Sequence, residues 1–180
     1  MLDRLLRLAD GADRFVRRIG EIMAWTGLAM VLVIAFNVCA RYLFSFGAVA
    51  MQETEWHLMA VGALFGMSYG LNRGEEVRVD VLYGNFSART KRIVNAVGAF
   101  LLALSAIAIA YLALRFVSQS YALGEGSADP GGLPARWALK AAIPIAFALL
   151  ALQALIAFLR DLAVLLRGED ALAAPVPSKS

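Results

Sequence analysis

Residues 97–114 read VGAFLLALSAIAIAYLAL, a stretch without a single charged side chain. At 1.5 Å rise per residue, a helix of this length nearly spans the roughly 30 Å hydrocarbon core of a bilayer. Apolar residues continue on both sides, and three similar runs lie elsewhere in the chain. The sequence therefore predicts an all-α membrane protein with four transmembrane helices, expected at about 22–43, 52–71, 93–117 and 138–159.

The composition agrees with a membrane protein. Apolar residues make up 61% of the 180 residues, whereas soluble domains are closer to half apolar. The net charge of +3 comes from basic residues in short segments beside the apolar runs, without the interleaved aromatic residues that stack on bases. We therefore expect membrane lipid, and no nucleic acid, as a partner.

Both ends of the chain differ from the apolar runs. Residues 1–20 are predicted to form an amphipathic helix lying in the membrane interface, followed by the transmembrane domain at 21–167. A solvated extension is the alternative, and the acidic residues within this segment disfavour a signal peptide. The tail at 168–180 is rich in Ala, Pro and Ser and is expected to be disordered. The apolar stripe of the N-terminal helix comprises Leu2, Leu5, Leu6, Ala9, Phe15, Val16 and Ile19.

The arginines and lysines predict the orientation. The first 20 residues and the connection 72–92 carry five each, whereas the connection 44–51 carries none and 118–137 carries one. Basic residues are retained on the cytoplasmic side of a membrane. We therefore expect both termini and the middle connection in the cytoplasm, with the other two connections facing outward.

Small and polar residues within the spans suggest contacts between helices. Gly62, Gly66 and Gly70 share one face of the second span and predict a close seam with a helix of this or another chain. Incidental glycines are the alternative. Asn37 lies deeper in the first span and is expected to hydrogen-bond to another helix.

Charged residues gather at the outer ends of the first two spans. An ion pair between Arg41 and Glu53 is one interpretation, and separate contacts with headgroups are the other. Pro144 is expected to kink the last span by removing one backbone hydrogen bond. Residues 123–137 are dense in turn-forming residues, which predicts a loop. As the longest outward segment, this loop is the natural docking surface for an external partner.

Catalytic and cofactor chemistry find little support. With one cysteine (Cys39) and one histidine (His57), the chain lacks the residues for a disulfide, a zinc site or a haem held by two histidines. No carboxylate lies at mid-membrane depth, so a proton relay is disfavoured. The residues thus predict a small subunit that is not an enzyme and holds no cofactor.

Several strings resemble the small membrane subunit of TRAP (tripartite ATP-independent periplasmic) transporters, over roughly residues 22–166. Residues 52–57 and 124–137 resemble in particular the mannitol/chloroaromatic branch, which includes 2-oxo acid and lactate systems. Gln52 and Glu76 depart from the family pattern, in which an acid and a histidine are common. The strings are NVCARYLF (37–44), Gln52-Glu53, Gly66, RGEEVRVD (73–80), LPARW (133–137) and Ile143-Pro144.

The resemblance implies a role. The chain would be a static, multi-pass subunit of the bacterial inner membrane that pairs with a large permease subunit carrying the substrate and sodium sites. A periplasmic binding protein would deliver an organic acid, and an ion gradient would drive its uptake. The residues expected to make structural or partner contacts are Arg41, Gln52, Glu53, Arg73, Asp80 and Pro144. Those expected to dock the binding protein are Glu125, Asp129, Pro134, Arg136 and Trp137. For Trp137, a role as an anchor at the membrane interface is the alternative.

Two other classes of protein stay open from the residues alone. One is the membrane anchor of a respiratory complex, which a visible absorption spectrum would reveal. The other is a homo-oligomeric exporter, which would not purify with a much larger membrane protein.

Overall fold

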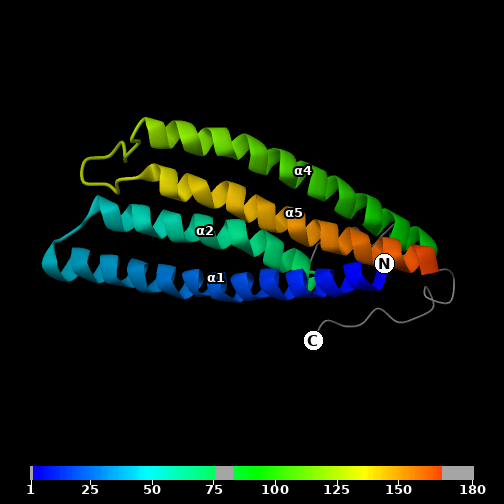
Figure 1. The fold of residues 1–180 in the computed structure, drawn as a ribbon. Helices are drawn as coiled ribbons and strands as arrows, with labels where there is room; N and C mark the ends of the chain where they lie inside the picture. Colours follow the sequence, from blue (N-terminus) through cyan, green and yellow to red (C-terminus); the bar gives the residue numbers. More distant parts are fainter. Residues whose placement is uncertain (1, 76–82, 168–180) are drawn as a thin grey trace.

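The computed structural model describes residues 2–75 and 83–167, which form four long helices arranged as two hairpins. These are α1 (Leu2–Phe44), α2 (Val49–Arg73), α4 (Ala88–Ala122) and α5 (Arg136–Arg167). In Figure 1 the α1–α2 connection and the loop 123–135 lie at one end of the bundle, called here the loop end. The start of α1, the start of α4 and the end of α5 lie at the other, called the terminal end. The all-α fold is confirmed, and the described residues form four helices where four spans and a separate N-terminal helix were expected.

The first helix corrects the prediction of a separate N-terminal element. A single helix of 43 residues, about 64 Å long, runs from Leu2 to Phe44 with no break at Gly20. Glycine weakens a helix by only about 1 kcal/mol relative to alanine, and good helix formers flank it on both sides. Val16, from the stripe expected to face the membrane interface, instead packs in a buried cluster with Phe65 of α2 and Leu149 of α5.

Helix α5 is the central element, because it contacts α4, α2 and α1. Against α4 the contact is made largely by alanines: Ala103 and Ala106 of α4 are 2% and 1% exposed, and Ala154 of α5 is fully buried. Small side chains let two helix backbones approach closely. Pro144 is buried inside α5, and the helix continues on both sides of it.

Three helices, α1, α4 and α5, are long and apolar enough to cross a membrane, judged by length and composition alone. On α4 the large apolar side chains point outward: Leu104 is 57% exposed and Leu112 is 64% exposed. Such a surface suits contact with lipid. Helix α2 carries more polar residues and is not among the three.

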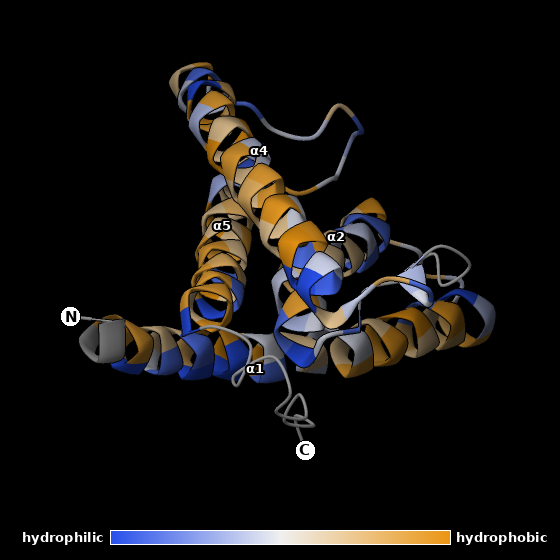
Figure 2. Cartoon of the chain, turned by 90° about the vertical axis from the view of Figure 1, so that its right-hand side faces the viewer, coloured by the Kyte–Doolittle hydropathy of each residue, from blue (hydrophilic) through white to orange (hydrophobic). Residues whose placement is uncertain are grey.

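Helix α1 is inclined to the rest of the bundle. In Figure 2 it runs across the lower part of the view, whereas α4 and α5 rise above it. Hydrogen bonds join it to α2 at two levels: Asn37 Nδ2 donates to Glu55 Oε1 (2.9 Å), and Asn72 Nδ2 donates to the Asp13 carbonyl (3.2 Å). Between these two levels α1 covers about 36 Å and α2 about 26 Å. The longer path of α1 follows from its inclination.

Candidate functional site

The loop 123–135 is anchored to the bundle by one buried carboxylate, that of Glu53 in the first turns of α2. Glu53 is 2% exposed. Its Oε1 accepts a hydrogen bond from the Ser127 hydroxyl, and its Oε2 accepts one from the Leu133 backbone N–H (2.5 Å). The Arg136 guanidinium lies 3.6 Å from Oε1. Two loop residues and the first residue of α5 therefore converge on a side chain from another hairpin.

The backbone around this anchor leaves no room for a side chain at Gly132. A Cβ there would clash with Ser127 and lie 2.8 Å from Glu53 Oε2. The neighbouring Gly131 has a φ of 80°, a conformation that residues with a side chain rarely adopt. The two consecutive glycines are thus what lets the loop approach the carboxylate.

A second carboxylate, Glu125, holds the start of the loop. Its Oε2 accepts hydrogen bonds from Lys140 Nζ (2.5 Å) and the Ser120 hydroxyl (2.6 Å). The Lys140 ammonium also lies 4.0 Å from the centre of the Phe116 ring. The hydrogen bond from Lys140, followed by that from Ser120, lowers the pKa of Glu125 below its ordinary value. Glu125 is therefore ionised at neutral pH and ties α4, the loop and α5 together.

The residues predicted to dock a partner separate into two groups. Glu125 and Arg136 are engaged by the bundle itself, whereas Asp129 and Pro134 are exposed. Trp137 is half-buried, and its ring packs edge-on against Tyr121 at 5.3 Å. We call the loop 123–135, with its outward-facing Asp129 and Pro134, the docking platform, after the role predicted for it from the sequence.

The suggested ion pair between Arg41 and Glu53 is not formed. Glu53 faces the loop and α5, so its oxygens are occupied by the donors described above. Arg41 is exposed and has no ion pair with any residue that the structure describes. The prediction that Asn37 bonds to another helix is correct, and its partner is Glu55.

Gln52, Arg73 and Asp80 were also predicted to make structural or partner contacts, and these contacts stay predictions. Gln52 and Arg73 are half-buried on α2, with Arg73 in its last turn. Asp80 and the tail 168–180 lie outside the described residues.

The glycine face of α2 makes a close contact at only one of its three positions. A Cβ on Gly62 would lie 2.8 Å from Thr26 Oγ1 of α1, whereas Cβ atoms on Gly66 and Gly70 would meet nothing within 4 Å. On α1 it is Gly20 that approaches closely, against the ring of Tyr69. The seam thus uses Gly62 and Gly20 within the chain and leaves Gly66 open.

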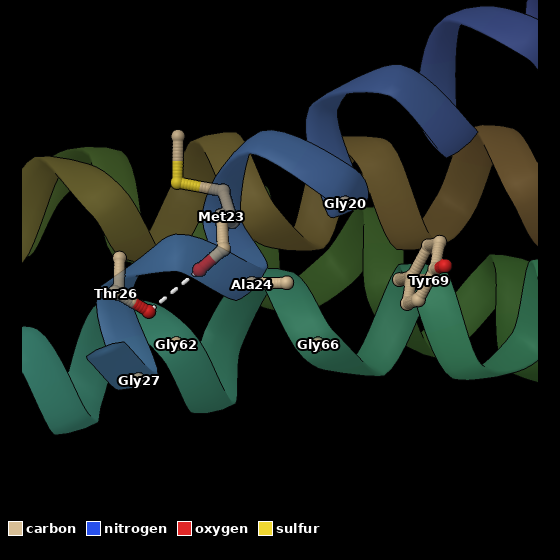
Figure 3. A pocket seen from close by; sticks show the side chains of 8 residues that line it. All are labelled: Gly20, Met23, Ala24, Thr26, Gly27, Gly62, Gly66 and Tyr69. Carbon is tan, nitrogen blue, oxygen red and sulfur yellow. Dashed lines mark hydrogen bonds between the residues drawn. The ribbon is translucent and has the colours of Figure 1, made fainter. Parts of the chain in front are cut away.

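Beside this seam lies a groove of about 250 Å³ between α1 and α2. Figure 3 shows its small residues, with Tyr69 at one end and the hydrogen bond from Thr26 Oγ1 to the Met23 carbonyl at the other. Its wall is formed mainly by backbone and short side chains. The lining residues are Gly20, Met23, Ala24, Thr26, Gly27, Gly62, Gly66 and Tyr69.

Toward the terminal end, a polar network missed by the sequence reasoning ties α1 to α5 and α2. Asp13 Oδ1 accepts hydrogen bonds from Gln153 Nε2 (3.0 Å) and Arg160 Nη1 (3.1 Å). Arg160 Nη2 pairs with Asp10 at 2.9 Å. Asn72 Nδ2 donates to Gln153 Oε1 (3.2 Å), and Gln153 is 1% exposed. No regular spacing links these residues in the sequence, so only the fold brings them together.

The fold and these clusters define a class: a multi-pass membrane protein whose polar side chains hold helices and a loop in place. Residues 30–164 match the family described as "Tripartite ATP-independent periplasmic transporters, DctQ component". Because the match covers most of the chain, the chain belongs to this family. Comparison with curated proteins and comparison with solved structures each found no match.

Membership of this family confirms the resemblance at the level of the family. The chain is the small membrane subunit of a secondary transporter, a transport protein rather than an enzyme. Membership of the family excludes two other classes for this chain, the membrane anchor of a respiratory complex and the homo-oligomeric exporter. The family implies association with a large membrane subunit and a binding protein.

Proposed function

We propose that this chain is the static small permease subunit of a TRAP system for the uptake of an organic acid, and that its docking platform receives the periplasmic binding protein. The observation that carries the proposal is the anchoring of the loop by buried Glu53. A binding protein that must dock, release its ligand and leave requires a contact of modest area on a surface of constant shape.

The same proposal assigns the scaffold role to the α1–α2 face. The groove beside Gly66 is open and lined by short side chains, which suits the backbone of a helix from the large permease subunit. That subunit would carry the substrate and the sodium ions whose gradient drives uptake. The strings at 52–57 and 124–137 favour a substrate of the 2-oxo acid or mannitol/chloroaromatic branch.

For the membrane, we propose that α2 is the fourth span, although its composition is more polar. Its 25 residues reach about 37 Å, enough for the hydrocarbon core. Glu53, Ser68 and Asn72 are all buried, so these three polar groups are shielded from lipid. With the basic residues retained inside, the loop end faces the periplasm and both termini lie in the cytoplasm.

The docking role is tested by reversing one exposed charge. In proteoliposomes containing both membrane subunits, uptake is measured against binding-protein concentration for wild type and Asp129→Lys. An exposed ion pair contributes about 0.2–1 kcal/mol, so the half-saturating concentration should rise by up to about fivefold if Asp129 meets a basic group. Assembly with the large subunit should be unchanged, since Asp129 is exposed.

Glu75→Lys is the matched control. Glu75 is an exposed acid just beyond α2, near the terminal end, and its reversal should leave the half-saturating concentration as in wild type. If Asp129→Lys and a second exposed change, Pro134→Gly, both leave the half-saturating concentration and the maximum rate unaltered, the platform does not dock the binding protein.

A further inference from the structure

Contacts toward the terminal end fix the level of the first turns of α1. Arg160 of α5 pairs with Asp10, and the adjacent Asp161 pairs with Arg92 of α4 at 2.7 Å. Asp10 and Arg92 therefore lie at the same level along α5. Three residues on, the Asp13 carbonyl accepts from Asn72, which is the penultimate residue of α2.

This level is a boundary of the apolar part of the bundle. At Arg92 the long apolar run of α4 begins, and beyond Asn72 the helix α2 ends. Residues 10–13 of α1 thus lie where the hydrocarbon core would give way to headgroups. Because α1 is inclined, its turns move away from this boundary more slowly than those of α2.

Three arginines face outward in this part of α1. Arg7, Arg14 and Arg18 are spaced by seven and four residues, which places them on one face of α1. All three are exposed, and that face is opposite the buried Val16.

The acids near Arg7, Arg14 and Arg18 form ion pairs with other arginines. Asp10 and Asp13 are engaged by Arg160, and Glu21 is paired with Arg17 at 3.0 Å. Within residues 2–75 and 83–167, no ion pair is formed by Arg7, Arg14 or Arg18. The outward face of this segment is therefore strongly positive.

Large apolar side chains accompany the arginines. Leu8, Phe15 and Ile22 recur every seven residues and are 72%, 55% and 64% exposed. Figure 2 shows the mixture of hydrophilic and hydrophobic residues in this half of α1, in contrast to its more uniformly hydrophobic other half. Cations and large apolar groups stand side by side along this stretch of α1.

We propose that this ridge, made of Arg7, Arg14, Arg18, Leu8, Phe15 and Ile22, binds anionic phospholipid. The guanidinium groups would hold headgroup phosphates in charge-assisted hydrogen bonds, and the apolar side chains would lie along the upper acyl chains. Lipid matches both chemistries, because a phospholipid presents a negative headgroup directly beside hydrocarbon. The proposal rests on the membrane placement given above, with the terminal end at the inner leaflet.

The test uses the full-length chain in nanodiscs of phosphatidylcholine, alone or with phosphatidylglycerol. Lipid retained by the released protein is measured by native mass spectrometry, and the melting temperature is measured in both discs. Wild type should retain phosphatidylglycerol and melt higher in its presence. The triple change Arg7→Gln, Arg14→Gln and Arg18→Gln should lower the affinity for phosphatidylglycerol about fivefold per arginine and abolish the rise.

Two control variants make the result decisive. Arg17→Gln removes a neighbouring arginine that is already paired with Glu21, and should behave as wild type. Changing Arg7, Arg14 and Arg18 to lysine keeps the charge and should retain most of the preference. A triple glutamine variant with normal helix content and undiminished phosphatidylglycerol retention would overturn the proposal.

One further outcome would also overturn it. If the triple glutamine variant keeps its lipid preference but no longer purifies with the large subunit, the ridge is a protein contact. Failure of the docking role would leave lipid retention unaffected, and a reversed topology would be revealed by the reporter fusions described below, so the proposals fail separately.

Discussion

Glu53 is a carboxylate that lies apart from water yet has a donor for each of its oxygens. Buried polar groups are tolerated when they are fully hydrogen-bonded, and removing one partner leaves the others unsatisfied. The Ser127 hydroxyl, the Leu133 N–H and the Arg136 guanidinium all depend on this one side chain. A conservative substitution at Glu53 should therefore loosen the whole loop.

We expect Glu53→Gln to loosen the docking platform without unfolding the bundle. The amide has only one acceptor oxygen and no charge, so the Leu133 N–H loses a charge-assisted hydrogen bond, the Ser127 hydroxyl has to accept from the amide instead of donating, and Arg136 loses its negative partner. Hydrogen exchange of the Leu133 amide should accelerate several-fold, with smaller increases elsewhere in the loop 123–135.

Glu55→Gln is the matched control, since Glu55 lies on the same helix but bonds to Asn37. It should leave exchange in the loop as in wild type. Equal protection of Leu133 in wild type and Glu53→Gln would show that the buried carboxylate does not hold the platform.

The pH dependence of the platform should follow Glu125. Its pKa is lowered in the folded chain by the hydrogen bonds from Lys140 and Ser120. A lowered pKa means that the stabilisation is complete above the ordinary glutamate pKa, about 4.3, and is lost as the pH falls through the lower folded value. Loop protection, corrected for intrinsic exchange rates, should be constant from about pH 7 to 5 and fall only in stronger acid.

In Glu125→Gln the same measurement should give weaker protection with no decline attributable to this group. A wild-type loop that already opens between about pH 7 and 5 would contradict the assignment, because Glu125 remains ionised throughout that range.

Between α1 and α2, the two kinds of glycine predict opposite behaviour. Gly62→Leu would force Thr26 away from α2 and should destabilise the chain itself by about 1–3 kcal/mol, the usual cost of overpacking. Gly66→Leu fills open space and should leave the stability of the isolated chain nearly unchanged. If a helix of the large subunit occupies the groove, Gly66→Leu should instead weaken co-purification with that subunit.

Thermal unfolding and co-purification should be measured on both variants, with Gly98→Leu as a control. Gly98 has no neighbour within 4 Å of a Cβ and lies on α4, away from the groove. Normal co-purification and uptake with Gly66→Leu would mean that the groove is covered by lipid.

The helices were predictable because hydrophobic runs of this length have few alternatives in a bilayer. What the sequence could not show is where a helix continues: residues 2–20 and 22–43 differ in polarity, but both favour helix, so α1 passes through Gly20 without interruption. The contact that α4 makes with α5 through its alanines was equally unpredictable, because Ala103 and Ala106 look like every other alanine in an apolar run.

The polar clusters depend on geometry that no local pattern encodes. Glu53 and Leu133 are 80 residues apart, and Asp13 and Arg160 are 147 apart. The sequence correctly placed Glu53 at the loop end of the bundle. It suggested Arg41 as the partner because the outer turns of adjacent spans are near in sequence. In the structure, the loop 123–135 of the other hairpin supplies the partners of Glu53 instead.

For the molecule as a whole, the proposed topology predicts four reporter signals. Fusions after Gly47, Asn85, Gly131 and Ser180 should read outside, inside, outside and inside, since the basic segments are retained in the cytoplasm. Alkaline phosphatase and a fluorescent protein, used in parallel, report the two sides independently. If α2 did not cross the membrane, the signals at Gly47 and Asn85 would agree.

The anchoring of the loop also has a consequence for repeated binding and release of a partner. Ordering a flexible backbone costs about 1–2 kcal/mol of conformational entropy per residue. A flexible loop would lose this entropy again each time a partner bound to it. In this chain Glu53 and Glu125 order the loop when the protein folds. In the proposed docking role, each arriving binding protein would meet a surface that is already ordered, and the departing one would leave that surface unchanged for the next.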